Sequence, residues 1–361
     1  LEDSDAIGVF IEEEEIFRLR EIRPQVEFLR YVIVFGKVGA GFKPAPTTEE
    51  EYLYEELLKD SPETEPEMEW KVSNSDFAFL FYTGGTTGFP KGTVWDYEMR
   101  VRGLDVITLS ALGPFLERLP YLPEEAFQRA MTIMPFPIPP WVFRTNAFKR
   151  LIKRIRGSAR ADRFFLMLLG SAFNYRLSGG KIRLLVAAPL FHGTAYETNF
   201  STIGAAGGTS IYLTHRHPFD PKELWETVER EKANMIVMVG DAYAIPILEE
   251  LERKKYDTSS LSSIVSSGVR WSPQNKKRLL DKIPGLVLLD NLGTTEVSTA
   301  FSQVSAAGDS EISDLKINLT KSGIYPVRAI NPETKKDARP GERAELAYGG
   351  YTALGYWKDP E

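Results

Sequence analysis

Residues 234–268 read NMIVMVGDAYAIPILEELERKKYDTSSLSSIVSSG and contain one complete strand–helix–strand unit. The run at 234–240 is almost entirely apolar, the stretch at 241–255 predicts a helix, and 262–268 predicts a second strand. Strands that are apolar along their whole length are buried on both faces, and when helices connect them they form parallel sheets. This unit therefore predicts an α/β fold.

The same alternation continues on both sides of this unit. IRLLVAAPLF (182–191) and TSIYLT (209–214) predict two strands before it, with a helix near PKELWETVEREK. A helix from SPQNKKRLLDKI (272–283) and the strand LVLLDNLG (286–293) follow it. We expect a mostly parallel sheet covered by helices on both faces.

Composition limits the class of protein. The chain has 361 residues, of which 43% are apolar and 26% charged, as in an ordinary globular protein. Its formal charge of −6 argues against a general nucleic-acid-binding surface. The absence of cysteine excludes disulfides, zinc–thiolate sites and a cysteine nucleophile. Apolar runs such as FFLMLL at 164–169 are far too short to span a bilayer.

Three regions differ in pattern along the chain. Residues 1–98 alternate short strands with acidic helical stretches, including a helix predicted over 47–60 from a Thr-x-x-Glu capping box. Residues 99–180 show little strand signal and carry a basic helical run, and 181–361 hold the β/α alternation. Both ends break off at turn-like sequences, so we expect an internal piece of a longer protein.

The loop YTGGTTGFPKG at residues 82–92 follows an apolar strand and suggests a phosphate site. Glycines let the backbone N–H groups approach an anion, while threonine hydroxyls and a lysine add further donors. The loop is not a Walker A loop, because no glycine immediately precedes Lys91, and its spacing does not match a dinucleotide fingerprint. The candidate phosphate contacts are Thr83, Gly84, Gly85, Thr86, Thr87, Gly88 and Lys91.

With other segments in the same order, this loop resembles the signature of the adenylate-forming superfamily, and of acyl-CoA synthetases within it. The further segments are PLFHGTA (189–195), SSG (266–268), DNLGTTE (290–296) and GERAELAYGGYTALGYWKDPE (341–361). The resemblance covers most of the chain except 99–180. It implies the large N-terminal domain of these enzymes, with stacked, mostly parallel sheets flanked by helices and the start of a small distorted β-barrel. The family's mobile C-terminal domain is expected to be absent from the chain.

The resemblance implies an AMP-forming acid–thiol ligase, of the fatty-acid–CoA ligase type. A carboxylate attacks the α-phosphate of ATP with Mg²⁺ bound, which gives an acyl-adenylate and pyrophosphate. Coenzyme A then attacks the acyl carbon and releases AMP. The expected partners are thus a hydrophobic carboxylic acid, ATP and coenzyme A, with no nucleic acid.

The resemblance also assigns site residues. It places Lys91, His192 and Glu296 in catalysis, with Glu296 as the magnesium ligand and His192 near the acyl carboxylate. The nucleotide contacts that it adds to the loop are Ser267, Gly268, Asp290, Asn291, Leu292, Gly293, Thr294 and Thr295. The candidates for the acyl pocket are Met238, Val239, Gly240, Tyr243, Ala244 and Val269, together with His192.

Two positions depart from the family pattern. Gly84 stands where many members have serine, so one hydroxyl donor to phosphate is missing. Leu292 stands where an aromatic side chain commonly stacks on adenine. The family's ribose-binding aspartate and the essential lysine of its C-terminal domain are expected beyond GYWKDPE, so the chain alone would not hold a complete active site.

Two other functions stay open at this point. The first is an adenylation domain that loads an amino acid onto a carrier-protein thiol, where Asp241 would bind the substrate ammonium. The second is a non-catalytic nucleotide-binding or membrane-associated scaffold.

Membrane contact, cellular location and oligomeric state are also open in part. The basic residues Arg150, Lys153, Arg154 and Arg156 suggest peripheral membrane contact through 141–170, although we favour a packed insertion with a solvated basic face. We expect a cytoplasmic location and leave the oligomeric state open, with a homodimer as one option.

Overall fold

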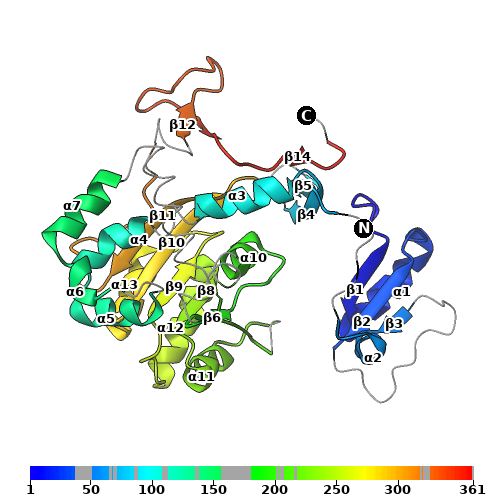
Figure 1. Ribbon diagram of the computed structural model, residues 1–361, viewed down its shortest axis with the longest axis horizontal. Coiled ribbons are helices and arrows are strands. Elements are labelled where there is room, and N and C mark those ends of the chain that lie inside the picture. Colours follow the sequence, from blue (N-terminus) through cyan, green and yellow to red (C-terminus); the bar gives the residue numbers. More distant parts are fainter. Residues whose placement is uncertain are drawn as a thin grey trace. The chain divides into compact units, whose positions relative to one another are not determined.

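A computed structural model gives the structure of the protein and describes residues 1–36, 51–64, 67, 71–84, 88–107, 113–134, 138–155, 180–200, 203, 207–214, 218–317, 319 and 326–359. The chain forms two compact units (Figure 1). The smaller unit comprises Leu1–Val94 with Gly355–Glu361, and the larger unit comprises Trp95–Leu354. Each unit is described separately below.

The larger unit is built on a six-stranded sheet with the order β11-β10-β9-β8-β6-β7. Neighbouring strands from β7 to β10 are parallel, and β11 pairs with β10 in the antiparallel direction. The strands are β6 (Arg183–Val186), β7 (Thr209–Tyr212), β8 (Met235–Met238), β9 (Ser263–Ser266), β10 (Val287–Thr294) and β11 (Ser298–Ala306). The predicted mostly parallel sheet is confirmed.

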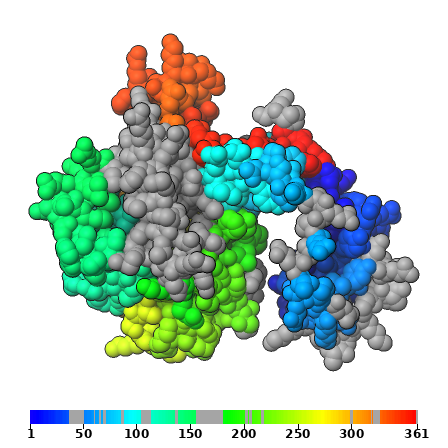
Figure 2. Space-filling view, in the orientation of Figure 1, coloured from blue at the N-terminus to red at the C-terminus, as the bar shows by residue number. Residues whose placement is uncertain are grey.

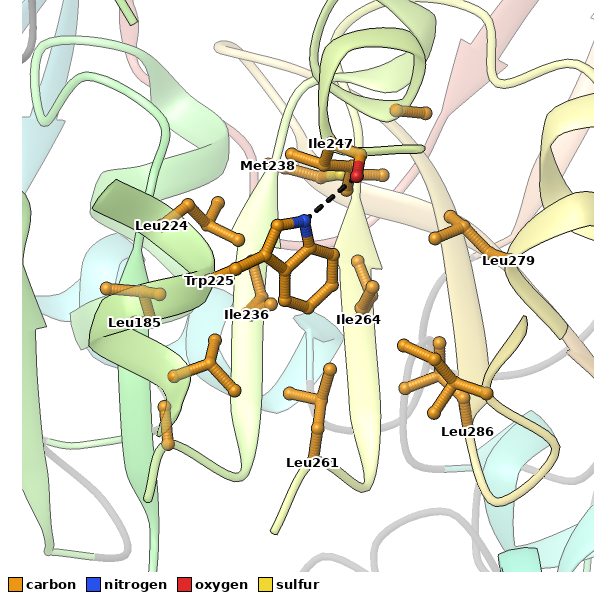
Figure 3. Close-up of a cluster of buried hydrophobic side chains, with 14 of the residues drawn as sticks. Leu185, Leu224, Trp225, Ile236, Met238, Ile247, Leu261, Ile264, Leu279 and Leu286 are labelled. Carbon is orange, nitrogen blue, oxygen red and sulfur yellow. Dashed lines mark hydrogen bonds between the residues drawn. The ribbon is translucent and has the colours of Figure 1, made fainter. Parts of the chain in front are cut away.

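Helices follow the parallel strands, as the alternation predicts. They are α10 (Gly193–Asn199), α11 (Pro221–Glu231), α12 (Gly240–Arg253) and α13 (Pro273–Lys282). Helices α11, α12 and α13 share one hydrophobic cluster with side chains of the sheet. In this cluster the indole of Trp225 lies among aliphatic side chains from strands and helices, and its Nε1 donates to the carbonyl of Ile247 at 2.9 Å (Figure 3).

The strands explain why the sequence shows continuous apolar runs. Ile236 and Met238 of β8 belong to the cluster with α11, α12 and α13, whereas Val237 and Val239 belong to a cluster with α10. Successive side chains of a strand point to opposite faces, so a strand that is covered on both faces is largely apolar along its whole length.

The region 99–180 is helical where the structure describes it. Its elements are α3 (Tyr97–Ile107), α4 (Gly113–Arg118), η4 (Leu119–Tyr121), α5 (Glu124–Ile133), α6 (Pro140–Phe143) and α7 (Asn146–Ile155). Phe148 and Ile152 of α7 pack into a cluster with Phe127 of α5 and Val287 and Leu289 of β10. These helices thus belong to the larger unit and cover part of the sheet.

The basic side of α7 is exposed. Arg150, Lys153 and Arg154 lie at the surface, where Figure 2 shows this helix in green. Leu151 is 52% exposed, whereas Ile152 is buried. Arg156 lies outside the described residues. The packing of Phe148 and Ile152 agrees with a packed insertion that has a solvated basic face.

The smaller unit contains two three-stranded sheets. One is the parallel sheet β1-β2-β3, and the other has the order β14-β5-β4. The elements are β1 (Gly8–Glu12), η1 (Glu13–Glu15), α1 (Ile16–Ile22), η2 (Arg23–Gln25), β2 (Tyr31–Phe35), β3 (Glu51–Leu53), α2 (Tyr54–Asp60), β4 (Phe77–Thr83), β5 (Lys91–Asp96, whose last two residues belong to the larger unit) and β14 (Gly355–Tyr356).

The helix predicted over 47–60 is partly wrong. Residues Glu51–Leu53 form β3, which pairs with Val32, Ile33 and Val34 of β2, and the helix begins only at Tyr54. The prospective capping threonines lie outside the described residues. Pairing with a buried strand here overrides the local helix signal of the glutamates.

The remaining strands of the larger unit, β12 (Val327–Ile330) and β13 (Glu345–Tyr348), form an antiparallel pair. We expected the small β-barrel to begin in this part of the chain. Among the described residues, no helix has the length and apolar character needed to cross a membrane.

Candidate functional site

The candidate site lies at the carboxyl ends of the parallel strands in the larger unit. From β6 the chain continues to β7 at one side, whereas from β8 it continues to β9 on the other side. The connections that leave the neighbouring strands β6 and β8 therefore diverge. Ligands of open α/β sheets bind at such switch points, outside the carboxyl ends of the strands.

His192 reaches this point from the connection after β6. It is the N-cap of α10, and its Nδ1 accepts a hydrogen bond from the backbone N–H of Thr194 at 3.1 Å. The neutral ring must then carry its proton on Nε2. Burial lowers the pKa of His192, which favours this neutral form near pH 7.

The ring of His192 lies directly over Gly268, which follows β9. A Cβ added to Gly268 would lie 2.6 Å from Cε1 and 3.0 Å from Nε2 of His192, and 3.4 Å from Cγ1 of Val239. The φ angle of Gly268 is +93°, a conformation that side chains other than glycine rarely adopt. The structure thus brings together three residues that the sequence predicted for the site, from three different strand ends.

The connection after β8 is tied to the connection after β9. Gly240 has a φ of +46°, and its N–H donates to Oγ of Ser266 at 2.7 Å. Added at Gly240, a Cβ would lie 2.6 Å from the carbonyl oxygens of both Val269 and Arg270. Only glycine allows these two backbone segments to approach so closely.

Asp241 strengthens the same tie. Its N–H donates to the carbonyl of Arg270, and its Oδ1 accepts hydrogen bonds from the N–H and Oγ of Ser272 and from Nδ2 of Asn275, each at 3.0–3.1 Å. The carboxylate thereby holds Ser272, the N-cap of α13, and Asn275 in the first turn of this helix. The sequence raised Asp241 only as an ammonium ligand and gave no sign of this role.

The side chains predicted for the acyl pocket fall into two groups. Met238 and Ala244 are fully buried in the core beneath α11, α12 and α13. Tyr243 packs against Phe219, with ring centroids 4.6 Å apart, and burial raises the pKa of its phenol. Val269 is 50% exposed. Lining of an acyl pocket by these residues stays a prediction.

The segment predicted to hold the nucleotide forms the end of β10 and the turn to β11. Asp290 and Asn291 are buried, and the register of the two strands shifts between Leu292 and Gly293. Thr295 and Glu296 lie in the turn and are partly exposed, and the carbonyl of Glu296 accepts from the N–H of Ala353 at 2.8 Å.

Two of these side chains already have partners within the protein. Nζ of Lys276 lies 2.5 Å from Oδ2 of Asp290, and Oδ1 of Asn291 accepts a hydrogen bond from Ser302. Lys276 is fully buried, and the sequence gave no reason to single it out.

The described residues contain no group of three or more His, Asp or Glu side chains that could hold a metal by themselves. A magnesium ion bound to ATP needs only one or two protein carboxylates, because phosphate oxygens and water supply its other ligands. A partly exposed glutamate in a turn, as Glu296 is, fits that donor set.

The predicted phosphate loop belongs to the smaller unit. Thr83 ends β4 and Lys91 begins β5, while Gly85, Thr86 and Thr87 lie outside the described residues. Gly88 has a φ of +151°. The ammonium of Lys91 lies 2.5 Å from Oδ2 of Asp359 and 5.0 Å from the ring centroid of Tyr356. Neither partner was foreseen from the sequence.

Comparison with known proteins gives relatives named as CoA ligases. A medium/long-chain-fatty-acid–CoA/3-oxocholest-4-en-26-oate–CoA ligase of Mycolicibacterium smegmatis is 25% identical over 99% of this chain and 54% of the relative. A 3-oxocholest-4-en-26-oate–CoA ligase of Rhodococcus rhodochrous is 26% identical over 85% of this chain and 45% of the relative. The chain therefore spans about half the length of the curated relatives it matches.

Solved structures share the fold. A long-chain-fatty-acid-CoA ligase from Archaeoglobus fulgidus superposes with a TM-score of 0.64 over 99% of this chain and 56% of that one, at 15% identity. ATP-bound MatB from Rhodopseudomonas palustris gives a TM-score of 0.62 over 100% of this chain and 54% of that one, also at 15% identity. The expected fold, the large domain of adenylate-forming enzymes, is thereby confirmed.

The family profile described as "AMP-binding enzyme" matches residues 166–357, more than half of the chain. This range includes the strand ends that carry His192, Gly268 and the turn of Glu296. The chain belongs to the AMP-binding enzyme family, and with it to the adenylate-forming enzymes that its motifs resemble.

Proposed function

We propose that the protein containing this chain is an ATP-dependent acyl-CoA synthetase that activates a hydrophobic carboxylic acid, fatty or similar. The observation that carries the proposal is the meeting of His192, Val239 and Gly268 at the switch point of the sheet, beside the strand that leads to Glu296. Relatives named as fatty-acid–CoA and steroid-acid–CoA ligases support the same class of substrate.

In the first half-reaction, a carboxylate oxygen of the acid attacks the α-phosphorus of ATP. The bond from that phosphorus to the pyrophosphate oxygen breaks, and pyrophosphate leaves. We assign to His192 a hydrogen bond from Nε2 to the carboxyl group of the acid, because its Nδ1 is engaged with Thr194. Such a hydrogen bond orients the acid without requiring a protonated imidazole.

Glu296 is the residue that would hold magnesium together with the phosphate oxygens of ATP, and this ion would neutralise part of the phosphate charge. The family resemblance assigns the pyrophosphate contacts to Lys91 and the loop around it. Donors that are already in place stabilise the charge that develops on a leaving group.

In the second half-reaction, the sulfur of coenzyme A attacks the acyl carbon, and the bond from this carbon to the phosphate oxygen of AMP breaks. AMP leaves with that oxygen, and the thiol proton passes to solvent.

The surroundings of Asp241 favour an acid without an ammonium group. Oδ1 of Asp241 accepts three hydrogen bonds from Ser272 and Asn275, so this oxygen is engaged in holding α13. A carboxylate that holds a helix in this way is poorly placed to bind the ammonium of an amino acid. This supports the acyl-CoA synthetase over an amino-acid adenylation domain.

A screen on the full-length protein tests the proposal. Pyrophosphate release should require a carboxylic acid and should improve with apolar chain length, and the product should be a thioester with free coenzyme A. Pyrophosphate release that depends on an amino acid, with transfer only to a carrier protein, would overturn it.

We also propose peripheral contact with anionic membrane through the basic side of α7. The exposed residues Arg150, Leu151, Lys153 and Arg154 support this idea, because they combine positive charge with one apolar side chain at the surface. The substrates of the named relatives are themselves apolar acids.

A further inference from the structure

The buried pair Lys276–Asp290 carries an inference about how the nucleotide segment is held. Nζ of Lys276, on α13, lies 2.5 Å from Oδ2 of Asp290, on β10. The side chain of Lys276 is 0% exposed and that of Asp290 is 8% exposed. The ammonium also donates to the carbonyl of Ser313 at 3.1 Å and lies 5.9 Å from the ring centroid of Trp271. Lysine is almost never buried in this way without such partners.

The side chains of Asp290 and Asn291 point to opposite faces of β10. Leu288 packs with α11, α12 and α13, whereas Leu289 packs with α4, α5 and α7. By this alternation Asp290 points to the side of α13, and Asn291 points to the opposite face, where Ser302 of β11 bonds to it. An adenine ring lying against one face of the strand meets only one of these two side chains.

The pair is part of a brace across β10 and β11. Gln303 is the partner of Asp290 in the register of the two strands, and its Nε2 donates to the same Ser313 carbonyl that Lys276 reaches. Its Oε1 accepts from the N–H of Lys316 at 2.9 Å. The brace therefore joins α13, β10, β11 and the segment around Ser313. It lies just before the register shift at Leu292 and Gly293 and the turn that carries Glu296.

The contacts of Asp290 agree with a structural role, and burial is the largest influence on its pKa. Burial raises the pKa of Asp290, and the hydrogen bond and charge of Lys276 act in the opposite direction. A buried charge of this kind is stable only while its partner is present. The contact with Lys276 engages Oδ2 of Asp290 on the α13 side of the strand.

We propose that Asp290 acts on the nucleotide only through Lys276, as a positioning residue that fixes the segment from Asn291 to Glu296. The adenine contacts then come from other groups of this segment, and Asp290 is not one of them. This inference rests on the proposed function, because it assumes that ATP binds at the end of β10.

The test uses binding of ATP and of inosine triphosphate, which lacks the 6-amino group, measured by calorimetry on the 361-residue chain. The informative variant is the double substitution Lys276→Met/Asp290→Val, because replacing a buried ion pair by apolar side chains of similar volume usually preserves folding. The matched control is Lys277→Met/Asp281→Val, which removes an exposed pair on the same helix.

If the proposal holds, the double variant weakens both nucleotides equally, by about tenfold, because the whole segment is displaced. The ratio of the two affinities stays at the wild-type value, and the control variant changes neither affinity. A fall in the preference for ATP over inosine triphosphate would overturn the proposal and show that Asp290 accepts from the adenine amine.

Unchanged affinities in a folded double variant would also overturn it, because the pair would then serve stability alone. Circular dichroism and thermal unfolding establish that the variant is folded. A folded wild-type chain that binds neither nucleotide would instead count against the proposed function, so the two failures are distinguishable.

Discussion

Lys276–Asp290 in the larger unit and Lys91–Asp359 in the smaller unit are two ion pairs with the same Nζ–Oδ2 distance of 2.5 Å. Their environments differ. The side chains of the first pair are 0% and 8% exposed, whereas those of the second are 46% and 36% exposed. Water screens an exposed pair, while a buried pair holds its partners in place because either charge alone would be costly.

The difference in exposure implies that the first pair holds its segment rigidly and that the second holds its lysine weakly. The buried pair fixes the strand that leads to Glu296, as do the ties of Gly240 and Asp241 for the neighbouring connections. The exposed pair holds Lys91 only weakly, so its ammonium can exchange Asp359 for another anion. Under the proposed function, a rigid segment suits the nucleotide base, and a weakly held cation suits a phosphate that arrives and leaves.

Removing one partner of the buried pair should have the largest effect. Lys276→Met leaves the Asp290 carboxylate buried without its cation, and we expect a loss of about 3–5 kcal/mol in the free energy of unfolding. Urea unfolding of the 361-residue chain measures this loss. A loss below about 1 kcal/mol, as for an exposed pair, would contradict the claim that burial makes Lys276–Asp290 the more important pair for stability.

Gly268→Ala should have the next largest effect. The new Cβ would meet Cε1 of His192 at 2.6 Å, and the φ of +93° adds backbone strain of about 1–3 kcal/mol. We expect lower stability and also a slower acid-dependent release of pyrophosphate by the full-length protein, because His192 must move.

Gly341→Ala is the matched control for this change. Gly341 has a similar φ of +89°, but among the described residues no atom lies within 4 Å of its new Cβ. The strain should therefore lower stability there without slowing pyrophosphate release. Equal slowing in both variants would remove His192 from the explanation.

Exposed cations of α7 should show a smaller effect. Lys153→Ala should weaken binding to anionic vesicles by about 1 kcal/mol at low salt, the usual contribution of one basic residue near a charged membrane. Binding should also fall as salt rises, because exposed charges are screened within about 10 Å at 0.1 M. Lys255→Ala serves as the control, and equal binding to neutral and anionic vesicles would contradict membrane contact by this helix.

Asp359→Asn should have the smallest effect on stability. The pair that it breaks is exposed, so we expect a change of about 0–1 kcal/mol in the free energy of unfolding. Thermal unfolding of the 361-residue chain measures it. A loss as large as that of Lys276→Met would show that exposure does not separate the two pairs.

The parts of the fold that the sequence predicted are those set by local pattern. The apolar run at 234–240 predicted a buried parallel strand, because burial on both faces favours apolar residues along the whole strand. The order of the motifs likewise predicted that His192 and Gly268 belong to one site, and the structure brings them into contact.

The rest depends on contacts between distant residues. Asp241 looked like a substrate ligand because its partners, Ser272 and Asn275, are 31 and 34 residues away. Lys276 lies in the basic stretch QNKKR, where nothing in the sequence singles it out. Only the packing of α13 against β10 turns it inward, and no local pattern reports that.

The most direct test of the central claim, that acid activation takes place at the end of β10, is acid-dependent pyrophosphate release by the full-length protein at limiting magnesium. We expect the wild type to release pyrophosphate and Glu296→Gln to be slower by about 100-fold or more, because it loses its magnesium ligand. Glu249→Gln, at an exposed position of α12, should match the wild type. Near-wild-type release by Glu296→Gln, or no release by the wild type with any carboxylic acid, would contradict the account.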